Sequence, residues 1–454
     1  MTEAPGERAG AVGEPAGATG GVTGDACGTT RTRGDACPGA LRLHPADDGA
    51  LARIRVPGGL IDPAAGRALA DAAEQLGDGG LDLTSRGNVQ LRGLSADAGA
   101  ELGELLDAVG LLPAPGHERV RNVLLSPLSG LDTTDRPDVT PWVRELDAEL
   151  CARDWTTGLS GRFLFACDDG RGDVAALDPD VTLSPDPADP ARALVRIAGA
   201  DLAAAVPFDA APRAALTAAR LFLDAARAAG TRAWQIRELP SDHALSGAGL
   251  VTALRAGGIP ATPAPVPAPA PAPAGVAADG EAGGEAGGPG PRPGRHGAAL
   301  VVLAPFARVR AEAWRLLVDL AGPTGPRTTP WRGFVLPQAP PGAEQALAEA
   351  GLITEARDPR ARISACVGRP GCAKAHADVR AEALALADTA DGPLPVHWSG
   401  CDRRCGHPRG TAWVDVIAGP DGTRLVTRPG ADPVHAPGPV PAATLAALRT
   451  VTGR

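Results

Sequence analysis

The chain has 454 residues, a net charge of −9 and an apolar fraction of 44%. This length predicts about two to four domains, and the acidic balance without a long basic run argues against a nucleic-acid partner. The sequence shows no run of eighteen apolar residues and no basic start followed by an apolar core. We therefore expect a cytoplasmic protein with no membrane span and no secretory signal.

The first part of the chain is an arm followed by a small folded unit. Residues 1–33 are rich in Gly, Ala, Thr and Glu, and we expect them to be disordered. Region 34–115 follows as a half-domain in which helices cover one face of a sheet. Its apolar periodicity predicts, in order, a strand at 51–56, a helix at 62–76, strands at 81–84 and 89–92, and a helix at 96–109.

Region 116–257 has the pattern of a second α/β domain. We predict a helix at 139–154, an apolar strand at 162–167 and a long amphipathic helix at 211–229. The tripeptide Asp168-Asp169-Gly170 after the strand is typical of a turn.

Region 258–297 lacks core-forming side chains, and we expect a linker there. Residues 260–274 alternate Pro and Ala, which favours a polyproline II spacer. After it, region 298–357 repeats the earlier pattern, with predicted strands at 299–304 and 333–336 and helices at 311–320 and 343–350. The segment 329–336 also resembles 84–91, which indicates an internal duplication.

Region 358–454 contains the strongest chemical signal, two cysteine pairs. Cys366 and Cys372 are separated by five residues, Cys401 and Cys405 by three, and each pair lies among glycines and prolines. Four thiolates on two such loops suit either zinc or an iron–sulfur cluster. The five-residue gap is wide for a zinc knuckle, so the pattern favours a [4Fe–4S] cluster.

Three motifs together resemble the sirohaem-type nitrite and sulfite reductase superfamily. They are the two cysteine pairs, the segment 83–93 (Leu-Thr-Ser-Arg-Gly-Asn-Val-Gln-Leu-Arg-Gly), and Arg121-Asn122-Val123. The resemblance implies an α+β fold that is duplicated, with two ferredoxin-like half-domains and two α/β domains that bind the cluster and a tetrapyrrole.

Within this superfamily, Cys37-Pro38-Gly39, Pro57-Gly58-Gly59 and Thr329-Pro330-Trp331-Arg332-Gly333 are similar to the precorrin-3B synthases. That resemblance implies a monooxygenase that hydroxylates precorrin-3A at C20 with O2, forming a γ-lactone. It also implies a [4Fe–4S] cluster, a non-haem iron, and NADH-derived electrons delivered through a reductase or a ferredoxin.

Precorrins carry many carboxylates, which arginine binds bidentately. The motifs therefore suggest a substrate site made of Arg86, Asn88, Gln90, Arg121, Arg162 and Arg332. In the reductases a lysine follows two residues after the position of Arg162, but here that residue is Leu164. An apolar side chain delivers no proton to an oxyanion, so this departure favours the synthase.

Ligands for a non-haem iron are less defined. His397, His407, Asp168 and Asp169 are possible, but they show no compact facial-triad spacing, and Cys37 has no assigned role. Two alternatives stay open: a sirohaem nitrite or sulfite reductase, and a non-enzymatic iron–sulfur electron carrier or zinc-stabilised protein.

Overall fold

The computed structural model describes residues 37–266, 290–388, 392, 394–407 and 413–450. The predicted arm at 1–33 and the middle of the predicted linker lie outside these residues. None of the helices in the described ranges is long and apolar enough to cross a membrane.

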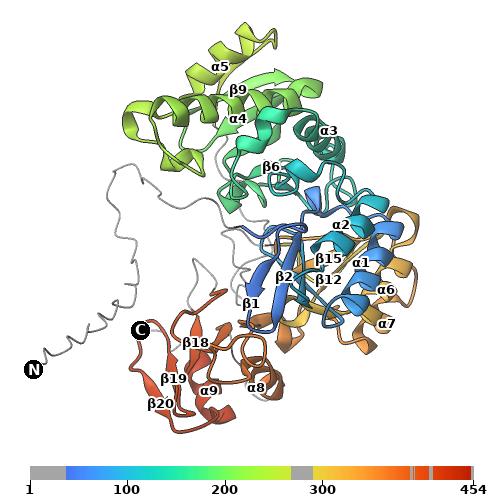
Figure 1. Ribbon diagram of the computed structural model, residues 1–454, viewed down its shortest axis with the longest axis vertical. Coiled ribbons are helices and arrows are strands. Elements are labelled where there is room, and N and C mark those ends of the chain that lie inside the picture. The colour runs from blue at the N-terminus through green and yellow to red at the C-terminus, as the bar shows by residue number, and fades with distance from the viewer. Residues whose placement is uncertain (1–36, 267–289, 389–391, 393, 408–412, 451–454) are drawn as a thin grey trace, which may run out of the picture.

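Two half-domains with the same topology form the middle of the molecule (Figure 1). The elements of the first are β1 (His44–Ala46), β2 (Gly49–Ile54), α1 (Pro63–Gln75), β3 (Gly80–Leu83), β4 (Val89–Leu94) and α2 (Gly99–Ala108). Those of the second are β11 (Gly294–His296), β12 (Ala299–Leu303), α6 (Ala311–Leu320), β14 (Arg327–Thr328), β15 (Gly333–Leu336) and α7 (Ala343–Glu349). The strand orders, β1-β2-β4-β3 and β11-β12-β15-β14, are equivalent.

The predicted duplication is confirmed down to the register of the repeated segment. Thr84 N donates to Asn88 O at 3.0 Å, and Thr329 N donates to Gly333 O at 2.9 Å. Within this turn Gly87 has φ 67°, and its counterpart Arg332 has φ 61°. The second copy therefore keeps a left-handed position that the first copy fills with glycine.

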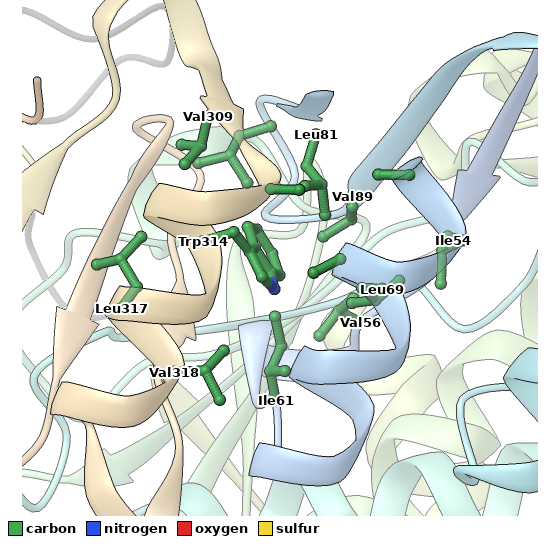
Figure 2. Packing of buried hydrophobic residues seen from close by; sticks show 14 of the residues in the cluster. Ile54, Val56, Ile61, Leu69, Leu81, Val89, Val309, Trp314, Leu317 and Val318 are labelled. Atoms are coloured by element: carbon green, nitrogen blue, oxygen red, sulfur yellow. The ribbon is translucent and has the colours of Figure 1, made fainter. Parts of the chain in front are cut away.

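The two half-domains share one hydrophobic core. In Figure 2, Trp314 of α6 lies between α6 and α1, close to Leu69 and Ile61. Its indole Nε1 donates to Gly66 O at 2.8 Å, and a Cβ atom at Gly66 would lie 2.6 Å from Val318. One further strand, β13 (Arg308–Arg310), belongs to the second half of the sequence but pairs with β3 of the first half-domain.

The start of α1 shows how the sequence sets this packing. Asp62 caps the helix, since its carboxylate accepts from the amides of Ala64 and Ala65, both at 2.9 Å. Pro63 occupies the first turn, where its missing N–H has no cost. The helix predicted at 62–76 is thereby confirmed.

The other two sheets are also copies of one another. The first has β5 (Val123–Leu125), β6 (Phe165–Cys167), β7 (Val181–Asp186), β8 (Asp189–Ile197), β9 (Leu202–Pro207) and β10 (Thr262–Pro265). The second has β16 (Ile363–Ala365), β17 (Val396–Ser399), β18 (Val414–Ala418), β19 (Arg424–Thr427) and β20 (Val434–Ala436). In both sheets the first three strands are parallel and the next two are antiparallel.

Helices cover one face of each of these sheets. They are α3 (Thr140–Cys151), α4 (Ala211–Ala228) and α5 (Gly247–Ala256) on the first, and α8 (Val379–Leu386) and α9 (Ala442–Arg449) on the second. Figure 1 shows the first domain above the paired half-domains and the second below them. The α+β fold with duplicated halves, expected from the sequence, is confirmed.

Two predictions near these sheets need correction. The linker predicted over 258–297 is wrong at both ends, because β10 pairs with β9 and β11 pairs with β12. Prolines 263 and 265 are tolerated because β10 is an edge strand, where a missing amide donor breaks no ladder. The strand predicted at 162–167 begins only at Phe165, because a turn closes before it through Phe163 N and Ser160 O, at 3.0 Å.

Candidate functional site

The cysteine pairs lie at the carboxyl end of two adjacent parallel strands. Cys366 follows β16 and Cys401 lies just beyond β17. The amide of Gly400 donates to Cys366 Sγ at 3.1 Å. Burial raises the pKa of the Cys366 thiol, the amides of Gly400 and Gly368 lower it, and the charges of Cys405 and Cys401 raise it again. These three cysteines are thus close enough to act on one another.

The loop that ends at Cys372 is held by the first half-domain. Arg92 forms a bidentate pair with Asp48, both contacts at 2.8 Å, and also donates to Gly371 O at 3.1 Å. The amide of Ala373 donates to Asp47 at 2.9 Å. Both aspartates lie in the turn between β1 and β2, so the half-domain anchors the residues on each side of Cys372.

The donor set can be tested against the group that the family implies. Within the described part of the chain, no three His, Cys, Asp or Glu side chains gather as one metal ion requires. A cubane cluster makes a different demand, because each of its four thiolates binds a separate iron and the sulfurs lie farther apart. An all-thiolate set on loops that direct amide N–H groups at sulfur fits such a cluster.

A group of arginines forms the second part of the site. Burial lowers the pKa of Arg53, of Arg86, and of Arg55, the last to about 9. Their charges and that of Arg162 act on one another, and Cys37 offsets part of the repulsion. Several cations held together at reduced exposure make a place where an anion would be stabilised.

Hydrogen bonds fix the orientation of this arginine group. Gln90 Oε1 accepts from Arg53 Nη2 at 2.8 Å, and Arg86 donates to Gly161 O and Arg162 O at 3.1 and 2.9 Å. Arg162 lies over the indole of Trp234, 4.8 Å from the ring centroid. Arg55 is 3% exposed, and its Nη1 is buried without a hydrogen-bond partner in the described residues. Its Nε donates to Arg119 O at 3.4 Å, so Nη1 is the nitrogen that is left to bind a ligand.

The arginines and the cysteine loop share one sheet face. On β4, Val89 and Leu91 point into the core, so Gln90 and Arg92 point to the opposite face. Gln90 holds Arg53 at one end, and Arg92 holds Gly371 at the other. The first half-domain therefore presents the cationic group and the cluster loop side by side.

Three sequence-predicted residues have other contacts. Asn88 accepts from Val56 N at 3.0 Å and stabilises the half-domain. Arg121 forms a bidentate pair with Asp147, both contacts at 2.7 Å, and donates to Leu111 O at 2.8 Å. Arg332 lies in the second copy of the turn, where its charge helps lower the pKa of His397. The structure thus brings Arg86, Gln90 and Arg162 together, and it pairs Arg121 with Asp147 instead.

The residues considered as iron ligands are engaged elsewhere. Asp168 accepts amides of Gly170 and Gly172 at 2.8 and 2.9 Å, which confirms the predicted turn. Asp169 pairs with Arg171. The imidazole of His397 is 2.8 Å from Ser364 Oγ, and His407 Nε2 is 2.9 Å from Asp415.

Leu164 lies in an apolar environment. It packs with Leu124, Ala166, Val174 and Trp331, and it is 5% exposed. These apolar side chains donate no proton at the position where the resemblance to the reductases leads one to expect a lysine.

Sequence reasoning missed Arg53 and Arg55. The alternation at 51–56 contained the signal, because the small and apolar residues Ala52, Ile54 and Val56 face the core and the arginines take the other face. The alternation alone does not show which other residues lie against the face that carries the arginines.

Comparisons with known proteins agree with this geometry. Residues 44–109 match the family described as nitrite/sulfite reductase ferredoxin-like half domain. A precorrin-3B synthase from Sinorhizobium sp is 28% identical over 431 residues, which is 90% of this chain and 86% of that protein. A ferredoxin–nitrite reductase from Synechococcus elongatus is 28% identical over 395 residues, 79% of this chain and 74% of that protein.

A solved structure shows the same fold. The Mycobacterium tuberculosis NirA protein aligns with a TM-score of 0.62 at 20% identity, over 88% of this chain and 79% of that one. The half-domain match and the long alignments point the same way. Residues 44–109 match the ferredoxin-like half domain of the nitrite and sulfite reductases, and the chain resembles a precorrin-3B synthase along most of its length.

Proposed function

We propose that this protein is a monooxygenase of the precorrin-3B synthase type, acting in aerobic cobalamin biosynthesis. It would hydroxylate precorrin-3A at C20 with O2 and close a γ-lactone from an acetate side chain. One oxygen atom enters the product and the other leaves as water, with two electrons from NADH delivered through a reductase or a ferredoxin. The observation that carries the proposal is the similarity to a precorrin-3B synthase over 90% of the chain.

The arginine group suits such a substrate. An acidic protein repels a polycarboxylate at long range, so binding requires a local cationic surface. Arg53, Arg55 and Arg86 provide one, with Arg162 at its exposed edge. Partial burial strengthens the pairing of these arginines with carboxylates, and such pairs would fix the orientation of the tetrapyrrole.

Cys366, Cys372, Cys401 and Cys405 would hold a [4Fe–4S] cluster, which when bound passes single electrons. The amides of Gly400 and Gly368 at Cys366 stabilise negative charge on the sulfur. The contacts of Arg92 and Asp47 would keep the Cys372 loop in place on the sheet face that carries the arginines. A non-haem iron, also implied by the family, has no ligand set that we assign.

A second candidate function is sirohaem-dependent nitrite reduction with ferredoxin, favoured by the similarity to ferredoxin–nitrite reductases. The buried, apolar surroundings of Leu164 weigh against it, because reduction of an oxyanion needs proton donors at that position. If sirohaem were bound, the purified protein would show an intense Soret band and a red band.

The test uses protein purified without oxygen and supplied with precorrin-3A, NADH and an electron-transfer system under ¹⁸O2. We expect one ¹⁸O atom in the product, and no nitrite- or sulfite-dependent oxidation of reduced viologen. Turnover at the full rate without O2, or rapid nitrite reduction, would overturn the proposal. Iron and sulfide analysis of the same preparation distinguishes an iron–sulfur protein from a zinc protein.

A further inference from the structure

A row of polar side chains crosses the sheet beneath the second cysteine loop. Ser364 of β16, His397 of β17 and Asp415 of β18 are direct partners in the strand register. Successive residues of a strand point to opposite faces, so these three share one face. Their neighbours Ala365, Trp398 and Val416 fill the core on the other face.

Two residues of the row, His397 and Asp415, are buried and contact the loop at 401–407. His397 is 0% exposed, and its Nδ1 lies 2.8 Å from Ser364 Oγ. Asp415 is 5% exposed and pairs with two loop residues, Arg404 and His407. The rings of His397 and His407 are 5.3 Å apart and meet edge to face.

These contacts flank a cysteine. Arg404 immediately precedes Cys405, and His407 follows it by two residues, so Asp415 ties down both sides. Arg404 has φ 47°, a left-handed conformation that costs energy in a residue with a side chain. Its ion pair with Asp415 offsets that cost.

The first copy of the sheet provides a comparison within the same chain. There the equivalent partners are Leu124 of β5, Ala166 of β6 and Thr182 of β7. Leu124 and Ala166 belong to a buried apolar cluster. The same sheet topology is therefore stable with no histidine or aspartate at these positions.

Burying an imidazole and a carboxylate costs free energy that an apolar row avoids. The polar row occurs only in the copy whose loops carry the four cysteines. This free-energy cost is explained if the polar row stabilises the conformation of the loop at 401–407 and not the sheet itself.

We infer that Asp415 and His397 are positioning residues, which hold the loop at 401–407 so that Cys401 and Cys405 present their sulfurs to an iron–sulfur cluster. This inference rests on the proposed cluster. Asp415 acts through Arg404 and His407. His397 supports the loop through the contact of its ring with His407, while Ser364 fixes the orientation of the imidazole. Metal sites depend strongly on such outer contacts.

The test compares Asp415→Asn, Asp415→Ala and His397→Gln with a control at the equivalent position of the first copy, Thr182→Val. We expect Asp415→Ala to lose cluster iron to a chelator about 10- to 100-fold faster than wild type, with His397→Gln intermediate. Asp415→Asn removes a negative charge near the cluster, so its midpoint potential should rise. Thr182→Val should match wild type in both measurements.

Hydrogen exchange separates this role from a general loss of folding. The amides at 401–407 should exchange faster in the Asp415 variants, while those of β17 and β18 keep their protection. Wild-type chelation rate, potential and exchange in all three variants would overturn the inference and leave the proposed function intact. Wild-type protein that binds no iron or sulfide would overturn both.

Discussion

Ser126 in the first copy occupies the place of Cys366 in the second. The amide of Ser126 donates to Cys167 O at 3.1 Å, and that of Cys366 donates to Trp398 O at 2.9 Å. The Ser126 hydroxyl accepts from the amide of Asp169 at 3.2 Å, whereas Cys366 Sγ accepts from that of Gly400 at 3.1 Å. The two copies thus share the same backbone hydrogen bonds at this position. The side chain carries a hydroxyl oxygen in the first copy and a sulfur in the second.

The first copy fills this place with its own side chains. Ser126 donates to Asp173 at 2.6 Å, and Arg171 pairs with Asp169. The proposed cluster therefore belongs to the second copy.

The first prediction concerns the cluster ligands. Cys401→Ser should lose cluster iron and sulfide together with the visible absorption, because a hydroxyl binds these irons less well than a thiolate. Cys151→Ser, at the end of α3 and outside both loops, serves as the control. A Cys401→Ser protein with full iron and sulfide would refute the ligand assignment.

The second prediction concerns the arginine group. Arg55→Met keeps most of the side-chain volume but removes the charge. Loss of one charged hydrogen bond, worth about 1.5–3 kcal/mol, should weaken precorrin binding roughly 10- to 150-fold. Arg67→Met is the matched control, since Arg67 is an exposed residue of α1 paired with Asp319. Equal affinities for the two variants, with cluster content intact, would show that Arg55 does not face the substrate.

The third prediction separates Arg121 from that group. Its guanidinium is buried and bound to Asp147 and Leu111 O. Arg121→Ala should therefore lower the free energy of unfolding by about 3–5 kcal/mol, because Asp147 loses its partner. The exposed pair Arg220–Asp224 on α4 is the comparison, and Arg220→Ala should cost less than about 1 kcal/mol. Denaturant unfolding at one pH measures both.

The fourth prediction concerns pH. Burial, followed by the charge of Asp168, raises the pKa of Asp173 from 3.8 to about 7. The folded state then holds this proton more tightly than the unfolded state. Its stabilising effect is complete below about pH 4 and is lost as pH rises through about 7, by up to about 1.4 kcal/mol per pH unit.

Asp173→Asn keeps the acceptor for Ser126 but carries no titrating proton. Its unfolding midpoint should therefore change less than that of wild type between pH 5 and pH 8. Parallel curves for the two proteins would mean that Asp173 titrates normally.

Local patterns predicted most of the helices and strands. The cap of α1 and the apolar periodicity of α1, α4 and α6 depend on residues that are close in the sequence, and the repeat at 84–91 and 329–336 indicated the duplication. The pairing of β10 with β9 was hidden because an alternating Pro-Ala segment has the same composition in a spacer and in an edge strand.

The candidate site was predictable only in part. Spacing identified the cysteines, and motif resemblance identified Arg86 and Arg162. The roles of Arg55, Arg121 and Asp415 depend on which distant residue meets each side chain, and strand register over long separations is not written in any local pattern. The role of Asp415 in particular can be inferred only from the register of β16, β17 and β18, which places it next to His397.

Strand β13 belongs to the second half of the sequence but completes the sheet of the first. A protein made as two separate polypeptides, divided between β10 and β11, would therefore give an N-terminal fragment with an unpaired edge on β3 and a bare apolar face on α1. We therefore expect neither fragment to fold stably by itself. When the two fragments are co-expressed, they should assemble into one active protein, because each half-domain then acts as an obligate subunit of the other.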